Sequence, residues 1–171
     1  MPELIVPKDA REQAQYMFPY QKVGGITHAL HEELLEQLSQ QDIPYVTSMC
    51  RTKTLQSIGL KLRRTSWNEP VFDVHGIRII TRRDLFSAII DRIRAQWILP
   101  LELPGGFQPI RDHKDLNIKS RNSASLPLYD ATHVTFVIPH GARFAELQLF
   151  TVDTMFKAVT TREEYLRRRL I

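Results

Sequence analysis

The chain has 171 residues, of which 43% are hydrophobic and 25% charged, a balance that is typical of a folded domain and excludes a disordered, collagen-like or coiled-coil chain. Its single cysteine, Cys50, excludes an intramolecular disulfide and a multi-cysteine zinc module. The longest apolar runs are far shorter than the ~20 residues of a membrane helix, and residues 1–7 lack a signal-peptide pattern. We therefore expect no membrane contact.

Basic side chains gather in one part of the sequence. The net charge is +4, but residues 51–94 hold ten Lys and Arg against four Asp and Glu. Such a surplus is typical of a segment that meets a nucleotide phosphate, a nucleic acid or a lipid headgroup, and it is also common on solvated surfaces. Composition alone leaves these partners open.

The first third of the chain predicts two helices and a strand after a leader. Residues 1–25 indicate a leader with a short helix at 8–17. Apolar residues three and four apart predict a helix at 26–41. A short strand is expected at 43–49, and the helical pattern returns at 54–64.

The middle of the chain predicts a strand, a helix and a long loop. Residues 71–80 are β-branched and apolar enough for a buried strand. The spacing at 81–84 is that of a capping box, and a helix with one apolar face follows at 85–97. Turn residues fill 100–109, and the polar, basic stretch 111–125 is expected to be a loop.

The last part of the chain predicts a hairpin and a helix. Residues 129–138 and 143–150 have the pattern of two antiparallel strands joined at 139–141, and residues 151–171 are expected to be helical.

Helices and strands mixed around one sheet indicate a single α/β (α+β) domain over residues 1–171. Its expected parts are a leader (1–25), a core (26–151) and a C-terminal helix (152–171).

Glu146 lies in the middle of the second hairpin strand. Because side chains alternate along a strand, Glu146 and Gln148 face the side opposite to Leu147. A carboxylate there is costly to bury unless it meets a cation, but an antiparallel sheet often leaves one face in water. Both interpretations stay open from this strand alone.

Asp73 raises the same question in the predicted strand 71–80, which also carries His75 and Arg78. Two strand-borne carboxylates among Arg and Lys are the ingredients of a Mg²⁺-nucleotide site, since the metal takes oxygen ligands and the cations hold phosphates. A structural ion pair of Asp73 with Arg78 or Lys61 is the alternative. Gly76 marks either a bulge or a close approach of a ligand.

A third polar group surrounds the start of the helix predicted at 54–64. Arg51 and Lys53 come just before it, and Ser57 and Lys61 lie four residues apart on one face. Backbone N–H groups at a helix start, together with two or three cations, suit a triphosphate. An exposed amphipathic helix with scattered charge is the simpler alternative.

Four motifs follow one another in the chain: R-x-K-x-x-x-S-x-x-x-K at 51–61, D-V-x-G-I-R at 73–78, Y-D-A-T-H-V-T at 129–135 and E-L-Q-L-x-T at 146–151. Together they resemble the synthetase domain of the RelA/SpoT family of alarmone synthetases, over residues 43–151. The resemblance implies a nucleotidyltransferase-like fold with a mixed, mainly antiparallel sheet of about five strands flanked by helices. It also implies pyrophosphate transfer from ATP to the 3′-hydroxyl of a purine nucleotide.

The resemblance also implies a set of donor-site residues. Those expected to bind ATP are Arg51, Lys53, Ser57, Lys61 and Arg78. Arg51 would stack on the adenine, and the two lysines and the serine would hold the triphosphate. Asp73 and Glu146 would position Mg²⁺, and Glu146 would accept the 3′-hydroxyl proton.

The acceptor nucleotide is implied to bind a second set of residues. They are Tyr129, His133, Gln148, Lys114, Lys119 and Arg121. Tyr129 would stack on the acceptor base, and His133 would contact its phosphates or ribose.

The chain departs from the family in two places. Pro-Leu precedes Tyr129 where the family has Pro-Lys-x-Asn-Gly, and Phe150 stands where the family has Arg. The acceptor loop is thus rebuilt, so an adenosine acceptor giving (p)ppApp stands beside the guanosine acceptor that gives (p)ppGpp.

The chain has no His-Asp pair of the kind found in the family's hydrolase domain, so synthesis would be unopposed. With the short length, this resembles the family's toxic branch, which includes toxins delivered between bacteria and toxins paired with an antitoxin. We therefore expect action in a bacterial cytoplasm, delivery by secretion as part of a larger effector, and an immunity or antitoxin partner. The alternatives are pyrophosphorylation of a tRNA end and a non-catalytic nucleotide- or RNA-binding module.

Three further side chains are assigned no chemistry from the sequence. His28 and His31 match no zincin spacing and are expected on a helix surface. Cys50 is expected to be a packed core thiol.

Overall fold

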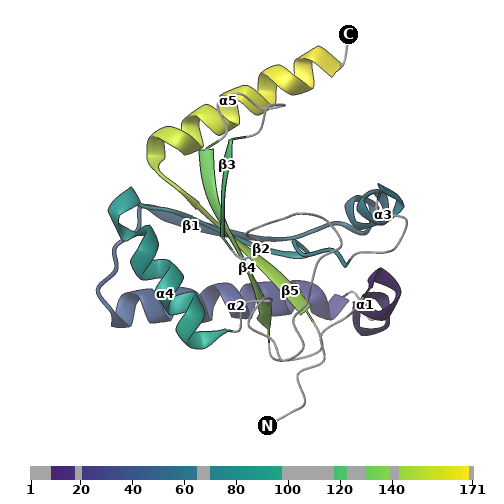
Figure 1. Cartoon of the computed structure of the whole chain (residues 1–171), viewed down its shortest axis with the longest axis horizontal. Coiled ribbons are helices and arrows are strands. Elements are labelled where there is room, and N and C mark those ends of the chain that lie inside the picture. The colour runs from purple at the N-terminus through teal and green to yellow at the C-terminus, as the bar shows by residue number, and fades with distance from the viewer. Residues whose placement is uncertain are drawn as a thin grey trace.

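One β-sheet runs through the molecule in the computed structural model, with helices on both sides (Figure 1). The structure describes residues 9–17, 21–64, 70–97, 118–122, 130–138 and 143–169. The elements are α1 (Ala10–Met17), α2 (Gln21–Gln40), β1 (Thr47–Thr52), α3 (Leu55–Arg64), β2 (His75–Ile80), the 3₁₀ turn η1 (Arg83–Leu85), α4 (Phe86–Gln96), β3 (Ile118–Asn122), β4 (Asp130–Ile138), β5 (Arg143–Phe150) and α5 (Val152–Arg169).

The sheet has five strands in the order β1-β2-β5-β4-β3. β2 and β5 run parallel, and the other neighbouring pairs are antiparallel. The predicted hairpin is confirmed as β4 and β5. The mixed, mainly antiparallel sheet expected from the sequence is therefore confirmed, and so is the C-terminal helix.

α2 and α4 cover one face of the sheet (Figure 1). Leu34 and Leu38 of α2 and Ile89 of α4 are fully buried, and they pack in one cluster with Ile77 and Leu147. Burying an apolar side chain of this size contributes about 1.5–3 kcal/mol. This apolar layer holds the two helices on the sheet.

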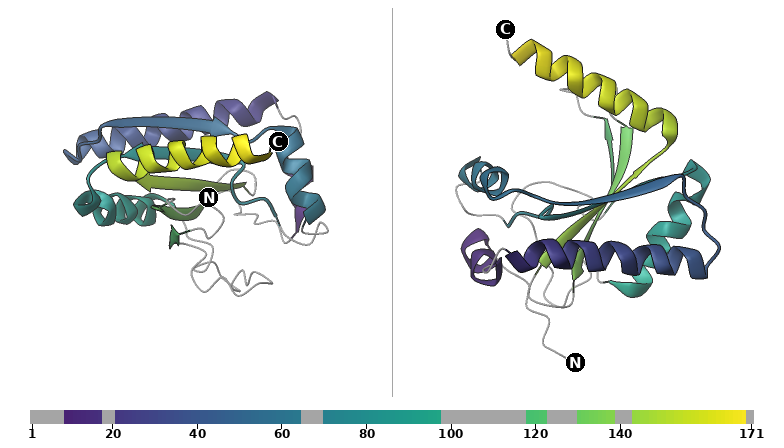
Figure 2. Two further views of the ribbon diagram at one scale, coloured as in Figure 1. Left: turned by 90° about the horizontal axis from the view of Figure 1, so that it is seen from above. Right: turned by 180° about the vertical axis from the view of Figure 1, so that it is seen from behind.

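The buried apolar clusters of the opposite face lie at its ends. α5 lies over one end (Figure 2), where the buried cluster consists of Ile80, Ala131 and Phe150, with Met155 and Ala158 packed against it. At the other end Phe72 packs edge-on against Phe144, with ring centroids 4.7 Å apart. Between these ends the side chains of β2, β5 and β4 on this face are polar, and Met49 of β1, opposite Arg78, is an exposed apolar side chain.

α2 ends in a Schellman motif, which confirms the predicted end of this helix. The Ile43 N–H donates to the Leu38 carbonyl at 2.9 Å and the Asp42 N–H to the Ser39 carbonyl at 3.1 Å. Asp42 adopts the left-handed region with φ 52°, the conformation that this motif requires of the residue after the helix.

The helix predicted at 26–41 begins earlier, at Gln21. Its first turns contain Gly24 and Gly25, which weaken a helix, but Val23 is fully buried in a cluster with Ile58 and Leu62. This tertiary packing stabilises the start of α2.

Two strands have other boundaries than predicted, and a third strand lies in a predicted loop. The strand expected at 43–49 is β1, Thr47–Thr52. The strand expected at 71–80 shortens to β2, because residues 72–74 form a turn. The loop expected at 111–125 contains β3, whose polar sequence pairs with β4 through the backbone and carries no apolar alternation.

The predicted capping box at 81–84 is wrong. The Thr81 hydroxyl donates to the Pro44 carbonyl at 2.8 Å, and Asp84 pairs with Arg82. The turn η1 precedes α4 instead, without a side-chain cap.

Among the described helices, none is long and apolar enough to span a membrane.

Candidate active site

The strand register brings the polar residues of four strands into two adjacent rows. Arg51, Gly76 and Glu146 pair across β1, β2 and β5, and Arg78, Gln148 and His133 pair across β2, β5 and β4. Opposite residues of neighbouring strands point to the same side. All these side chains therefore lie on the face that α2 and α4 leave uncovered.

Glu146 is held by two hydrogen bonds. The His133 ring Nδ1 lies 2.8 Å from Glu146 Oε1, and Gln148 Nε2 donates to Oε2 at 2.9 Å. Burial raises the pKa of Glu146, but the hydrogen bonds and charge of these partners outweigh burial and lower the pKa below its usual 4.5. The Glu146 side chain is 14% exposed, so it is reachable from solvent.

Gln148 connects Glu146 to Arg78. Its Oε1 accepts from Arg78 Nε at 3.1 Å and Nη2 at 2.7 Å, and the Arg78 guanidinium lies 5.0 Å from the Phe150 ring centroid. The oxygen and the nitrogen of the Gln148 side-chain amide both form hydrogen bonds within the protein. We therefore interpret Gln148 as a support for Glu146. Its predicted contact with the acceptor nucleotide stays a prediction.

Asp73 lies in the turn before β2, so the prediction that both carboxylates are on strands is wrong for this residue. Lys53 Nζ is 2.8 Å from Asp73 Oδ2 and Lys61 Nζ is 2.6 Å from Oδ1. Burial raises the pKa of Asp73, but the charge of Lys61 and the hydrogen bonds of both lysines lower it below 3.8. The alternative of an Asp73–Lys61 ion pair is thus present, with Lys53 added to it.

Three residues, Gln13, Lys53 and Phe144, hold the turn that carries Asp73. The Gln13 side chain of α1 donates to the Val71 carbonyl at 2.9 Å and accepts from its N–H at 2.7 Å. The Lys53 N–H donates to the Val74 carbonyl at 2.8 Å. Phe72 packs on Phe144 of β5, two residues before Glu146. The negative charge of Asp73 raises the pKa of Glu146.

Arg51 lies within β1, two residues before Lys53, and its side chain crosses over Gly76. A Cβ atom at Gly76 would lie 3.4 Å from Arg51 Cγ and 3.7 Å from Nε. The pairing continues through Gly76 on both sides, so the glycine marks this close approach and no bulge.

The start of α3 is capped by Thr54, whose Oγ1 accepts from the Ser57 N–H at 3.2 Å. The Thr54 hydroxyl also donates to Ser57 Oγ at 3.0 Å. Lys61 follows one turn later and reaches back to Asp73. The expected helix start after Lys53 is confirmed, and Asp73 joins Lys53 to Lys61. The predicted contact of Ser57 with a triphosphate stays a prediction.

The predicted acceptor residues are only partly described. Tyr129 and Lys114 lie outside the described residues. Lys119 and Arg121 lie in β3, where they pair with His133 and Ala131. His133 itself contacts Glu146, an interaction that the sequence reasoning missed although the hairpin register would have placed both side chains on one face.

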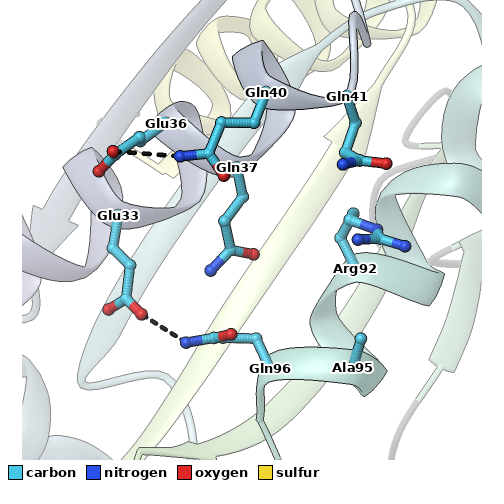
Figure 3. A pocket seen from close by; sticks show the side chains of 8 residues that line it. All are labelled: Glu33, Glu36, Gln37, Gln40, Gln41, Arg92, Ala95 and Gln96. Carbon is cyan, nitrogen blue, oxygen red and sulfur yellow. Dashed lines mark hydrogen bonds between the residues drawn. The ribbon is translucent and has the colours of Figure 1, made fainter.

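A polar hollow of about 330 Å³ lies elsewhere, between α2 and α4 (Figure 3). There Gln96 donates to Glu33 at 2.7 Å and Gln40 donates to Glu36 at 3.2 Å. Since α2 and α4 cover the apolar face of the sheet, this hollow does not belong to the candidate site.

Comparisons with known proteins identify the fold. No family model matches the chain, and no curated protein does either. Among solved structures, small alarmone synthetase 1 from Bacillus subtilis bound to its product pppGpp matches with a TM-score of 0.58 and 16% identity, over 91% of this chain and 82% of that one. Small alarmone synthetase 2 from the same organism matches with a TM-score of 0.57 and 19% identity, over 94% and 82% of the two chains.

A GTP pyrophosphokinase family protein from Streptococcus pneumoniae matches with a TM-score of 0.54 and 22% identity, over 92% of this chain and 77% of that one. The chain has the fold of the small alarmone synthetases. The expected RelA/SpoT synthetase fold is thereby confirmed.

Proposed function

We propose that the chain is a pyrophosphokinase that transfers pyrophosphate from ATP to the 3′-hydroxyl of a purine nucleotide. One observation carries the proposal: on a synthetase fold, Glu146 stands on the uncovered face of the sheet, and the charge of Asp73, which is held by Lys53 and Lys61, acts on its pKa. These are the groups that such a transfer needs, namely a proton acceptor, oxygen ligands and cations for phosphate.

The donor side of the site is formed by β1, α3 and the turn before β2. Lys53 and Lys61 bring two positive charges to the single negative charge of Asp73, so the cluster attracts phosphate. Arg51 lies two residues before Lys53, with its side chain over Gly76. From there its planar guanidinium can stack on the adenine. Phosphoryl-type transfer depends mainly on such positioning and charge neutralisation.

Mg²⁺ is the cofactor that we propose. Asp73 and Glu146 offer carboxylate oxygens, the ligands that Mg²⁺ prefers. The charge of Asp73 raises the pKa of Glu146, and a divalent cation would offset that charge. Both are 14% exposed, which leaves room for water and phosphate oxygens. When bound, the ion would neutralise the charge that develops on the transferred phosphates.

Glu146 is proposed to take the proton of the attacking 3′-hydroxyl. Its lowered pKa keeps it ionised at neutral pH, and the hydrogen bonds of His133 and Gln148 fix the direction of its two oxygens. His133 thereby becomes a positioning residue for Glu146, and its expected contact with the acceptor stays a prediction. The acceptor base and phosphates would meet Tyr129, Lys114, Lys119 and Arg121.

The test is an acceptor screen with the purified chain, ATP and Mg²⁺. With ATP labelled at the γ-phosphate, label should pass to the acceptor when GDP, GTP, ADP, AMP or a tRNA is added, or to ATP itself if ATP serves as acceptor. The labelled product distinguishes (p)ppGpp from (p)ppApp synthesis. Steep salt-dependent RNA binding without label transfer would favour the non-catalytic binder instead.

Glu146→Gln should lower transfer by at least about a hundredfold, because the amide cannot accept the proton, while the far-ultraviolet circular dichroism spectrum stays unchanged. Glu36→Gln, an exposed position on α2, is the matched control and should keep full activity. Wild-type turnover in the Glu146 variant would contradict the assigned role.

The biological setting is a further proposal. Unopposed synthesis in a bacterial cytoplasm would be toxic, so an immunity or antitoxin protein and secreted delivery are proposed with it. Growth arrest on induced expression, absent from the Glu146→Gln variant, is the expected result.

A further inference from the structure

Two histidines and the cysteine meet between α2 and β1, on the side of the sheet opposite to Glu146. His28 and His31 lie three residues apart on α2, so they share one face of the helix. Cys50 of β1 is partly buried and packs against the apolar cluster beneath that helix. One ligand atom of each residue lies within 4.8 Å of the other two.

The spacing of these atoms suits a small transition-metal ion. Zinc binds imidazole nitrogen at ~2.0–2.1 Å and thiolate sulfur at ~2.3 Å, so tetrahedral ligand atoms lie roughly 3.3–3.8 Å apart. A contraction of about 1 Å from the upper limit found here is within reach of small side-chain rotations. Two imidazoles and a thiolate are also the ligand types that zinc favours over magnesium.

A second observation points to a ligand at the same place. His31 Nε2 is buried and has no hydrogen-bond partner among the described residues, although buried polar atoms are nearly always paired. Glu32 lies 3.2 Å from His28 Nε2, the arrangement in which a carboxylate orients a metal-binding histidine.

We propose that His28, His31 and Cys50 bind one zinc ion, with water as the fourth ligand and Glu32 orienting His28. Binding would form one Zn–S and two Zn–N bonds and release the thiol proton of Cys50 to solvent. His28 is 67% exposed and provides the path of entry.

The ion would cross-link α2 to β1 through its bonds to the histidines and to Cys50. Cys50 precedes Arg51, whose side chain lies on the opposite face of the same strand. Zinc would therefore stiffen the strand that carries Arg51 and stabilise the fold. This inference is independent of the proposed transfer activity.

The test begins with the full chain, stripped of metal by a chelator and kept reduced. Titration with Co²⁺ should reach one equivalent and produce a sulfur-to-cobalt charge-transfer band with tetrahedral d–d bands, and Zn²⁺ should displace the cobalt. Cys50→Ala should abolish the charge-transfer band, and His31→Gln should weaken Zn²⁺ binding at least tenfold.

His28→Gln keeps the experiment decisive because this exposed position tolerates substitution without unfolding. Zn²⁺ at a hundredfold excess over its dissociation constant should raise the melting temperature of the wild type by about 5–10 °C, with a much smaller rise in this variant. Glu36→Gln, one turn beyond Glu32, is the matched control and should bind like the wild type. A cobalt spectrum without thiolate bands, or equal Zn²⁺ affinity in wild type and Cys50→Ala, would overturn the proposal.

Discussion

At the scale of single residues, Glu146 shows how a carboxylate is kept ionised within a sheet. Leaving a charge partly buried without partners would cost several kcal/mol, and here His133 and Gln148 supply a hydrogen bond to each carboxylate oxygen. Gln148 is in turn held by Arg78. The charge of Glu146 is thus stabilised by a chain of side chains from three strands.

The ionised carboxylates should make stability depend on acid pH. The folded-state pKa values of Asp73 and Glu146 lie below 3.8 and 4.5, so their stabilising contribution is complete above these values and is lost as pH falls through the lower, folded values. We expect the free energy of unfolding to decline as pH falls below about 4.5 in urea titrations. Asp73→Asn should decline less steeply, and an equal slope in both proteins would contradict the ion-pair assignment.

At the scale of elements, α1 is a support for the site. Gln13 makes two hydrogen bonds to the backbone of Val71 and is buried. The predicted leader thereby fixes the segment that leads into Asp73.

Gln13→Ala should lower the free energy of unfolding by about 2 kcal/mol, because it leaves two buried backbone groups of Val71 unpaired. Transfer activity should fall about tenfold through displacement of Asp73. Gln40→Ala removes an exposed glutamine that bonds only locally, to Glu36, and should change neither. Chemical denaturation and the label-transfer assay measure the two effects, and a fully stable Gln13 variant would refute the role of α1.

Asp42, after the end of α2, offers a second test at this scale. Its φ of 52° costs energy for a residue with a Cβ atom, so Asp42→Gly should raise the free energy of unfolding by about 0.5 kcal/mol. Asp42→Ala, which loses the polar side chain and keeps the Cβ atom, should lower it. The same order in thermal denaturation would confirm the left-handed cap.

At the scale of the whole molecule, the two faces of the sheet have different roles: one carries the hydrophobic core and the other the candidate active site. One face is packed against α2 and α4, while the polar centre of the other carries Glu146 and its partners. β5 belongs to both, since Leu147 points into the core beside Glu146, which points away.

Leu147→Ala should therefore lower the free energy of unfolding by about 3–4 kcal/mol, because the fully buried side chain leaves a cavity. Val46→Ala, at a position that is 66% exposed, should stay within about 0.5 kcal/mol of wild type. Urea denaturation followed by circular dichroism distinguishes the two, and equal stabilities would contradict the assignment of the core.

The sequence by itself determined the elements whose signal is local. The helices at α2 and α4 follow from apolar residues three and four apart, and the β4–β5 hairpin follows from alternation on either side of a turn. The motif around Lys53, Ser57 and Lys61 was predictable because a helix start needs only neighbouring residues. The order of four such motifs was enough to predict the fold.

Only the tertiary structure decided which distant residues meet. The pairs Gln13–Val71 and His133–Glu146 depend on strand order and on the docking of α1, and β3 depends on pairing with β4 rather than on its own polar sequence. The meeting of His28 and His31 with Cys50 depends on how α2 crosses β1. Periodicity reports the face on which a side chain lies, whereas the partner across that face is set by the packing of elements far apart in the chain.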